Sequence, residues 1–204
     1  MKKLVLKNFL SPGDIVTLTA AVRDLHRNFP EKFITDVRTP CPALWENNPY
    51  ITPLDDKAED VTVIECHYPL IHQSNQAPYH CIHGFIHFLS RHLNLNIRAT
   101  EFKGDIYISD LEKSWMSQIQ EMTGEDTPFW IIVAGGKYDF TAKWWSSARY
   151  QEVVDHFRGK IAFVQVGSRE HHHPPLRGVI DLRAKTDLRQ LVRLVYHSQG
   201  VLCP

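Results

Sequence analysis

Apolar positions along the chain follow two alternating spacings, and these spacings predict the secondary structure. Short runs of apolar and β-branched residues are typical of buried strands. Between these runs, apolar residues recur every three or four positions, as they do along one face of a helix. The predicted strands cover residues 4–7, 33–37, 61–66, 129–134, 161–166, 179–182 and 200–203, and the predicted helices cover residues 15–28, 42–48, 79–93, 110–122, 147–157 and 187–197.

The alternation of strands with helices predicts an α/β protein with parallel sheets covered on both faces. Residues 124–128 are the most linker-like stretch, and the alternation begins again after them. We therefore predict two Rossmann-like lobes, residues 1–125 and 126–204. Four strands are predicted after residue 125, whereas a complete Rossmann-like lobe has about six, so we expect the second lobe to be incomplete.

Composition narrows the classes of protein without identifying one. Among 204 residues, Lys plus Arg and Asp plus Glu both number 23, so no global field attracts nucleic acid or an anionic membrane. No apolar run reaches the roughly 18 residues of a membrane helix, and the N-terminus is interpreted as a strand rather than a signal peptide. The four cysteines form no CxxC pair, which favours a reducing cytoplasm.

The turn after the first strand contains the first candidate site, Ser11-Pro12-Gly13-Asp14. Ligands of parallel α/β sheets bind beyond the carboxyl ends of the strands. Gly13 allows a tight backbone there, and Asp14 stands in the first turn of a helix, where hydrogen bonds from N–H groups favour its ionised form. An ionised carboxylate facing a cleft is suited to be a general base. The same position also fits a carboxylate that only caps the helix.

The segment after the fourth strand contains the second candidate site. Gly135 and Gly136 would let the backbone approach a ligand closely, Thr141 offers a hydroxyl, and Lys143 offers a cation suited to phosphate. The next helix begins near Ser146 and directs N–H groups the same way. Together these residues predict a cradle for a diphosphate. The alternative is a surface loop in which the tryptophans at 144 and 145 are packing residues.

Two weaker patterns remain. Glu170 follows the next strand and could accept hydrogen bonds from a ribose, or it could belong to an exposed charged turn. His83 and His87 have the i, i+4 spacing of metal ligands on a helix, and His80 lies close by. No HExxH motif or partner carboxylate completes this pattern, so we predict no bound metal, and the role of these histidines stays open.

Several short segments occur together in an informative order and spacing. They are Ser11-Pro12-Gly13-Asp14-Ile15-Val16, Ala20-Ala21-Val22-Arg23-Asp24-Leu25, Glu46-Asn47-Asn48-Pro49-Tyr50, Lys143-Trp144-Trp145, Val166-Gly167-Ser168-Arg169-Glu170, Gly178-Val179-Ile180-Asp181-Leu182 and Thr186-Asp187-Leu188-Arg189-Gln190-Leu191. Taken together they resemble glycosyltransferase family 9, the ADP-heptose:lipopolysaccharide heptosyltransferases. The resemblance covers most of the chain and is weakest over residues 68–108, where we expect acceptor contacts.

The resemblance implies a GT-B-like fold and a metal-independent, inverting transfer of a heptose-like sugar from ADP-heptose to a glycan such as a lipopolysaccharide core, without a cofactor. Asp14 matches the family's proposed base. Thr141 and Lys143 match its donor-phosphate contacts, next to Gly135 and Gly136, and Glu170 matches its donor-ribose contact. Ser11, Gly13 and Lys7 would lie on the acceptor side. The expected location is the cytoplasm, with peripheral contact to the inner membrane if the acceptor is lipid-linked.

The chain departs from the family pattern at its C-terminal end. A D-[ST]-G-x-x-H loop, which holds donor phosphates in the family, would follow a strand like residues 200–203, and this sequence ends at Pro204. The alternative function is therefore a truncated, non-catalytic relative that binds nucleotide sugars or another protein. An open sheet edge would also favour self-association through residues 179–204. The identities of the acceptor and of the transferred sugar stay open.

Overall fold

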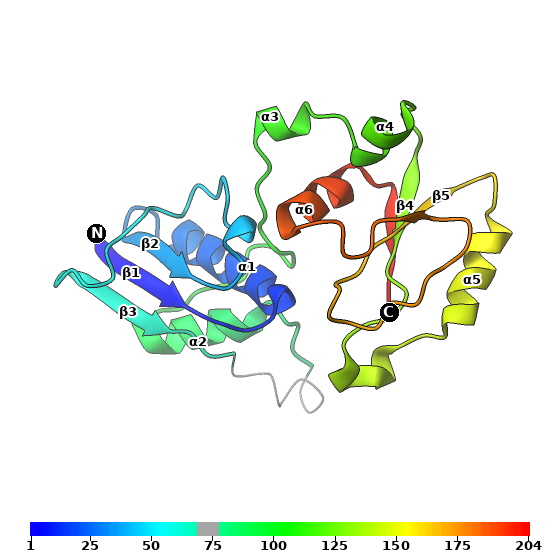
Figure 1. Cartoon of the computed structure of the whole chain (residues 1–204). Helices are drawn as coiled ribbons and strands as arrows, with labels where there is room; N and C mark the ends of the chain where they lie inside the picture. Colours follow the sequence, from blue (N-terminus) through cyan, green and yellow to red (C-terminus); the bar gives the residue numbers. More distant parts are fainter. Residues whose placement is uncertain (69–77) are drawn as a thin grey trace. The chain divides into compact units, whose positions relative to one another are not determined.

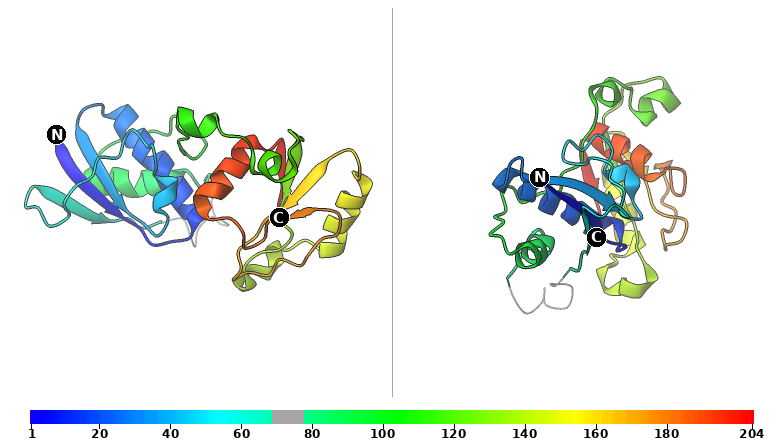
Figure 2. Two further views of the ribbon diagram at one scale, coloured as in Figure 1. Left: turned by 45° about the horizontal axis from the view of Figure 1, so that its top comes forward. Right: turned by 90° about the vertical axis from the view of Figure 1, so that its left-hand side faces the viewer.

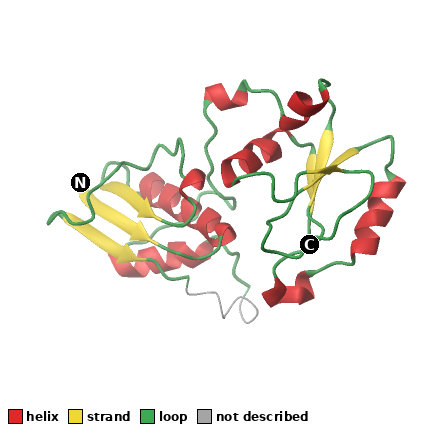
Figure 3. Ribbon diagram, viewed as in Figure 1, coloured by secondary structure: helices red, strands yellow, loops and turns green. Residues whose placement is uncertain are grey.

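A computed structural model describes residues 1–68 and 78–204 of the chain. The chain divides into two compact units, Met1–Ser109 and Asp110–Pro204, and each has its own parallel sheet with helices (Figure 1; Figure 3). The predicted α/β class is therefore confirmed. The division falls after Ser109 and not at residue 125, so residues 110–125 belong with the second unit. No helix in the described part of the chain combines the length and the apolar character of a membrane span.

The first unit is built on a three-stranded parallel sheet in the order β2-β1-β3. Its strands are β1 (Lys2–Lys7), β2 (Phe33–Arg38) and β3 (Val61–Glu65). The chain passes from β1 to β2 on one side of β1 and then returns to β3 on its other side. The strand order therefore reverses between the neighbouring strands β1 and β3. Such a reversal leaves a crevice beyond the carboxyl ends of the strands. The hydrophobic runs predicted all three strands to within about two residues.

Two helices cover one face of this sheet, α1 (Pro12–Asn28) and α2 (His83–Leu93) (Figure 1). Proline at the first position of α1 suits a helix start because its missing N–H group would have no partner there. The apolar stripe of each helix is buried, and so are consecutive residues of β1, as expected for a central parallel strand. The buried residues are Leu4, Val5, Leu6, Ile15, Leu18, Val22, Leu25, Phe85, Ile86 and Leu89. The predicted helix at 79–93 begins four residues later, and the predicted helix at 42–48 is a single 3₁₀ turn, η1 (Pro42–Leu44).

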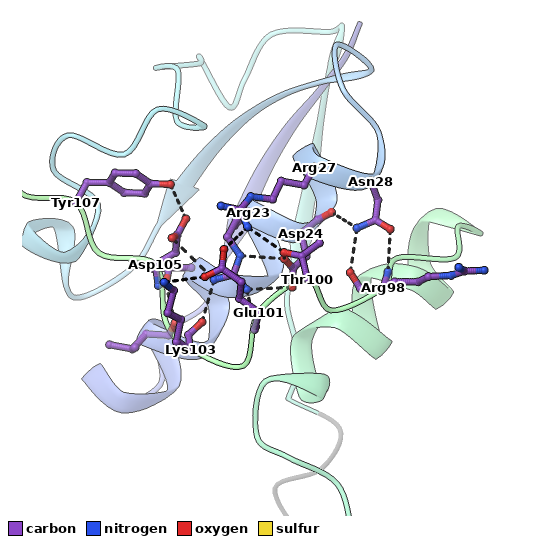
Figure 4. Close-up of polar contacts among 12 residues, drawn as sticks. Arg23, Asp24, Arg27, Asn28, Arg98, Thr100, Glu101, Lys103, Asp105 and Tyr107 are labelled. Atoms are coloured by element: carbon purple, nitrogen blue, oxygen red, sulfur yellow. Dashed lines mark hydrogen bonds and ion pairs between the residues drawn. The ribbon is translucent and has the colours of Figure 1, made fainter.

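A coil at residues 98–107 is held against α1 by buried polar contacts (Figure 4). The Arg23 and Asp24 side chains have no solvent exposure and form an ion pair with an Nε–Oδ1 distance of 2.9 Å. Arg23 also donates hydrogen bonds to the carbonyl oxygens of Glu101 at 2.8 Å and Lys103 at 3.0 Å. The Thr100 hydroxyl donates to Asp24 at 2.6 Å. We call these five residues the α1 clamp.

The second unit contains a four-stranded parallel sheet in the order β6-β5-β4-β7. Its strands are β4 (Phe129–Ile132), β5 (Ala162–Gln165), β6 (Ile180–Asp181) and β7 (Gly200–Leu202). Two helices, α5 (Ser147–His156) and α6 (Leu188–His197), lie on opposite faces of the sheet (Figure 1; Figure 2). All four strands were predicted from the apolar runs.

Alternation along β4 divides its side chains between two hydrophobic cores. Phe129 and Ile131 pack with Leu194 of α6, whereas Ile132 packs with Tyr150 of α5. A strand that contributes to cores on both faces of a sheet has a nearly continuous apolar sequence, and this explains why β4 was easily predicted.

The helix predicted at residues 110–122 is broken into α3 (Asp110–Lys113) and α4 (Gln118–Thr123). Ser117 caps α4 by accepting a hydrogen bond from the Gln120 N–H at 3.0 Å. Glu112 of α3 accepts hydrogen bonds from the Arg189 guanidinium of α6 at 2.6 and 2.7 Å. This bidentate ion pair ties α3 to α6, which explains why residues 110–125 group with the second unit.

Candidate functional site

Asp14 lies at the carboxyl edge of the first sheet, in the first turn of α1. It is the third residue after the N-cap Ser11, and its N–H donates to the Ser11 carbonyl at 2.9 Å. The start of a helix carries partial positive charge, which favours an ionised carboxylate. Burial raises the pKa of the Tyr68 hydroxyl, and the charges of Cys81 and Asp14 add to that rise. Asp14 is therefore electrostatically linked to Tyr68, which follows β3.

The predicted acceptor-side residues Lys7, Ser11 and Gly13 share this edge with Asp14. Lys7 ends β1, and its Nζ is 3.1 Å from the Oδ2 of Asp56. The structure corrects the role predicted for Gly13. A Cβ placed there would meet nothing within 4 Å, and its φ is not in the left-handed region. The turn therefore does not require glycine at this position.

Two hollows open along the carboxyl edge of the first sheet. The β1–β2 hollow has a volume of about 610 Å³, and its lining includes Lys7, Phe9, Arg38 and Asp56. The β1–β3 hollow has a volume of about 390 Å³, and Lys7 and Phe9 also contribute to its lining, together with Tyr68. The second hollow lies at the reversal in strand order, where ligands of α/β sheets bind.

Asn8 fixes the loop between these hollows, and the sequence analysis did not single it out. Its buried side chain donates from Nδ2 to the Cys66 carbonyl at 2.8 Å and accepts from the Leu10 N–H at 3.0 Å. The loop after β1 is thereby attached to the end of β3. An asparagine directly after a buried strand, three residues before a helix cap, is the signal that could have indicated this role.

The glycines predicted to approach a donor are packed against another loop of the same chain. Gly135 has φ +137°, and a Cβ there would lie 2.0 Å from the carbonyl oxygen of His172. Gly136 and His172 exchange two backbone hydrogen bonds of 3.0 and 3.1 Å. Packing of the loop after β4 against the loop after β5 therefore requires glycine at 135, and the approach of a ligand to Gly135 and Gly136 stays a prediction.

An aromatic stack joins the same two loops. The Trp144 ring stacks on the His172 ring with centroids 4.7 Å apart, and its Nε1 donates to the Lys137 carbonyl at 3.1 Å. Trp145 instead packs edge-on against the buried Tyr150 ring, with centroids 4.9 Å apart. Both tryptophans thus have the packing role that the alternative interpretation gave them.

A hollow of about 280 Å³ adjoins this stack, and its lining includes Gly135, Trp144, Ser146 and Ser147. The serines begin α5, and Ser146 makes no side-chain cap bond. N–H groups at the start of a helix are suited to bind phosphate oxygens. The structure therefore supplies a small polar hollow where the sequence predicted a diphosphate cradle.

The remaining predicted donor residues lie in exposed segments at the same edge of the second sheet. Thr141 and Lys143 belong to η2 (Tyr138–Lys143), a 3₁₀ segment that was predicted as a loop. Glu170 is exposed in the turn after β5, where its N–H donates to the Ser168 Oγ at 3.4 Å. Because β4 and β5 are neighbouring parallel strands, the loops after them emerge at one edge.

The histidines of the first unit form an aromatic group. The His83 and His87 ring centroids are 5.6 Å apart, Tyr79 packs on His87 at 5.3 Å, and Phe102 packs on both His80 and His83 at 5.3 Å. Burial lowers the pKa of His87, and the nearby His83 and Arg91 lower it further. Within residues 1–68 and 78–204, no three His, Cys, Asp or Glu side chains are grouped so that they could hold a metal ion.

No protein-family model and no curated protein matches the sequence, but solved structures match the fold. A glycosyl transferase of family 9 from Veillonella parvula DSM 2008 matches 98% of this chain with 74% of its own, at 14% identity and a TM-score of 0.70. E. coli ADP-heptose lps heptosyltransferase II matches 98% with 78% of its own chain, at 16% identity and a TM-score of 0.61. E. coli heptosyltransferase WaaC with ADP matches 98% of this chain with 80% of its own, at 11% identity and a TM-score of 0.59.

These matches confirm the resemblance at the level of the fold. At sequence identities of 11–16%, these matches show that the chain follows a similar path, but they do not test individual side chains. The expectation of a short second lobe is also confirmed, because the matched chains extend beyond the part that this one covers. The chain therefore has the GT-B-like, two-lobed α/β fold of the family 9 glycosyltransferases, with the second lobe incomplete.

Proposed function

We propose that the protein is a glycosyltransferase that transfers a heptose-like sugar from an ADP-sugar to a glycan acceptor, with inversion and without a metal. The observation that carries the proposal is a fold match over 98% of the chain to heptosyltransferases. Within that fold, a carboxylate begins the helix after β1, and a hollow beside the start of α5 adjoins the segment that contains Lys143.

On the acceptor side, Asp14 would accept the proton of the attacking hydroxyl. The acceptor oxygen then bonds to the anomeric carbon of the sugar as the bond from that carbon to the phosphate oxygen breaks. A single displacement of this kind inverts the anomeric centre. General-base assistance of this kind contributes about 10²–10⁴-fold to a rate.

On the donor side, the leaving ADP takes the electron pair of the broken bond and gains negative charge. The Lys143 ammonium, the Thr141 hydroxyl and the N–H groups that begin α5 are the groups suited to stabilise it. Glu170 would accept a hydrogen bond from the ribose. The contacts to the phosphates favour departure of ADP because they strengthen as negative charge develops on the leaving group, whereas the ribose contact only positions the donor.

Calorimetric titration with ADP tests the donor half of the proposal. Lys143→Ala should weaken ADP binding about tenfold, the effect of losing one charge-assisted contact of about 1.4 kcal/mol. Lys160→Ala removes an exposed lysine of the same unit outside the proposed site and should leave binding unchanged. Equal affinities for both variants and the unaltered protein would contradict the donor assignment.

Release of ADP from ADP-heptose in the presence of acceptor glycans tests the catalytic half. Asp14→Asn should lower turnover by at least about 10²-fold and keep ADP affinity, because it removes the base but no donor contact. Asp60→Asn, a change at the amino edge of the same sheet, should leave turnover unaltered.

The second candidate is a non-catalytic protein that binds nucleotide sugars or another protein. The fold matches leave it open, because at 11–16% identity they do not test individual side chains of the site. Tight ADP binding without any acceptor-dependent release of ADP would support this candidate and exclude the transferase. We also propose a cytoplasmic location, at the membrane if the acceptor is lipid-linked, which cell fractionation would test.

A further inference from the structure

The two hollows of the first sheet meet at one exposed aromatic ring. Phe9 contributes to the lining of both hollows and is 69% exposed, although the loop that carries it is fixed by the buried Asn8. Exposing a large apolar ring on a fixed loop beside a crevice gives a ligand an apolar surface at little cost in ordering. Phe9 is therefore placed to contact the apolar face of a ring-shaped ligand.

The charges that line the β1–β2 hollow are balanced in pairs, and the lining of the β1–β3 hollow adds one carboxylate, Glu65. The charged residues that line the β1–β2 hollow are two cations, Lys7 and Arg38, and two anions, Asp36 and Asp56. Lys7 is paired with Asp56 at 3.1 Å and Arg38 with Asp36 at 2.7 Å. A site built to hold a phosphate or carboxylate would present an excess of positive charge.

Paired charges still offer hydrogen bonds. Carboxylate oxygens accept from hydroxyl groups, and ammonium and guanidinium groups donate to them. A ligand with many hydroxyls and no net charge can use both kinds of partner, whereas an anionic ligand would be repelled by Asp36 and Asp56.

We propose that the two hollows on either side of Phe9 bind a neutral saccharide, with one sugar face against the Phe9 ring and its hydroxyls on the paired charges. This inference deepens the proposed function, on which it rests, by assigning an uncharged glycan as acceptor. The β1–β3 hollow would hold the residue that reacts, because it lies at the reversal in strand order and its lining extends to Leu10, four residues before Asp14. The β1–β2 hollow would hold the next sugar.

Saturation-transfer NMR of the whole chain tests the inference without depending on catalysis. The probes are neutral methyl hexosides of gluco, galacto and manno configuration, together with methyl glucuronide and glucose 6-phosphate. We expect transfer to at least one neutral hexoside, with at least threefold weaker binding of both anionic sugars. Absence of binding by every neutral hexoside, or a preference for either anion, would overturn the inference.

Two pairs of variants locate the binding site. Phe9→Ala should weaken neutral-sugar binding at least fivefold, whereas Phe102→Ala, which alters a 60% exposed phenylalanine of the same unit outside both hollows, should not. Equal binding by Phe9→Ala and the unaltered protein would show that the sugar binds elsewhere and would overturn the inference. Far-UV circular dichroism shows whether each variant is folded.

The charge argument has its own matched control. Asp56→Asn leaves Lys7 without its partner and should strengthen glucose 6-phosphate binding about threefold to fivefold, the range expected for one partly exposed charge. Asp60→Asn removes the same kind of partner from Lys3 at the other end of β1, where the Nζ–Oδ2 distance is 2.5 Å, and should have no effect. No gain with Asp56→Asn would overturn the charge argument.

ADP titration of the same variants separates the two proposals. If neutral sugars fail to bind while ADP binds with Lys143-dependent affinity, the saccharide inference fails and the transferase proposal stands. If neutral sugars bind at Phe9 but ADP does not bind, the saccharide site stands and the proposed function fails.

Discussion

Replacing Arg23 by methionine should destabilise the first unit more than any change of an exposed charge. Methionine keeps much of the side-chain volume, but it removes every hydrogen bond of the guanidinium. Those bonds go to both oxygens of Asp24, at 2.9 and 3.2 Å, and to the carbonyls of Glu101 and Lys103. Asp24 would remain buried with only the Thr100 hydroxyl as a side-chain partner among the contacts of the α1 clamp.

The expected magnitude follows from burial. Neither member of the pair has solvent exposure, and breaking such a pair from one side costs about 3–5 kcal/mol because the other charge stays buried. The total stability of a domain is about 5–15 kcal/mol, so the variant would lose a large part of it. Arg27→Met breaks the neighbouring ion pair to Glu101, whose side chains are 39% and 33% exposed, and should cost much less because water screens an exposed pair.

Urea unfolding followed by circular dichroism measures both costs, and hydrogen exchange shows where the loss occurs. Because the clamp holds residues 98–107, peptides from that segment should exchange faster in Arg23→Met under native conditions. The second unit has its own core and should keep its protection. A cost below about 1 kcal/mol for Arg23→Met, or equal costs for the two variants, would refute the reasoning from burial.

The other predictions concern backbone geometry and thiol chemistry. Gly135→Ala should destabilise the second unit by more than about 1 kcal/mol, because φ +137° is strained for alanine and its Cβ would meet a backbone oxygen. Gly13→Ala, by contrast, should change the stability of the first unit by less than about 1 kcal/mol. Equal shifts in melting temperature would contradict this difference. Burial, with a smaller effect of the adjacent glutamate, raises the pKa of Cys66 to about 12, so it stays a protonated thiol at pH 8. Iodoacetamide at that pH should therefore modify the exposed Cys81 and spare Cys66 until the protein is unfolded; equal labelling of the native protein would count against this.

Much of the architecture was predictable because it follows from local patterns. Every strand in the described part of the chain was found from apolar runs. The central strands β1, β4 and β5 were the clearest, because central parallel strands bury both faces and are continuous in sequence. The helix after the turn at residues 11–14 was also predicted. The carboxyl-edge positions of Asp14 and Lys143 followed from strand order alone, because loops that leave parallel strands emerge at one edge.

The features that were missed depend on partners distant in sequence. Nothing near Arg23 indicates that it is buried, since its partners in the coil lie about 80 positions away along the chain. The break before Ser117 was hidden because residues 110–122 have a continuous helical pattern. The ion pair of Glu112 with Arg189 could not be foreseen because the two residues are 77 positions apart. The need for glycine at 135 was recognised, but its cause lies in a loop 37 residues later, at His172.

The bridge and aromatic stack that join the loops after β4 and β5 also limit how this protein can be re-engineered. Gly136 and His172 are bonded through their backbones, and Trp144 lies on the His172 ring. Grafting one loop from a relative with a different nucleotide preference would therefore leave the other loop without its counterpart. A chimera that exchanges residues 133–147 and 166–178 together should fold, whereas either exchange alone should yield insoluble protein. The two loops thus behave as a single structural module, even though residues 148–165, with most of α5 and all of β5, separate them in the sequence.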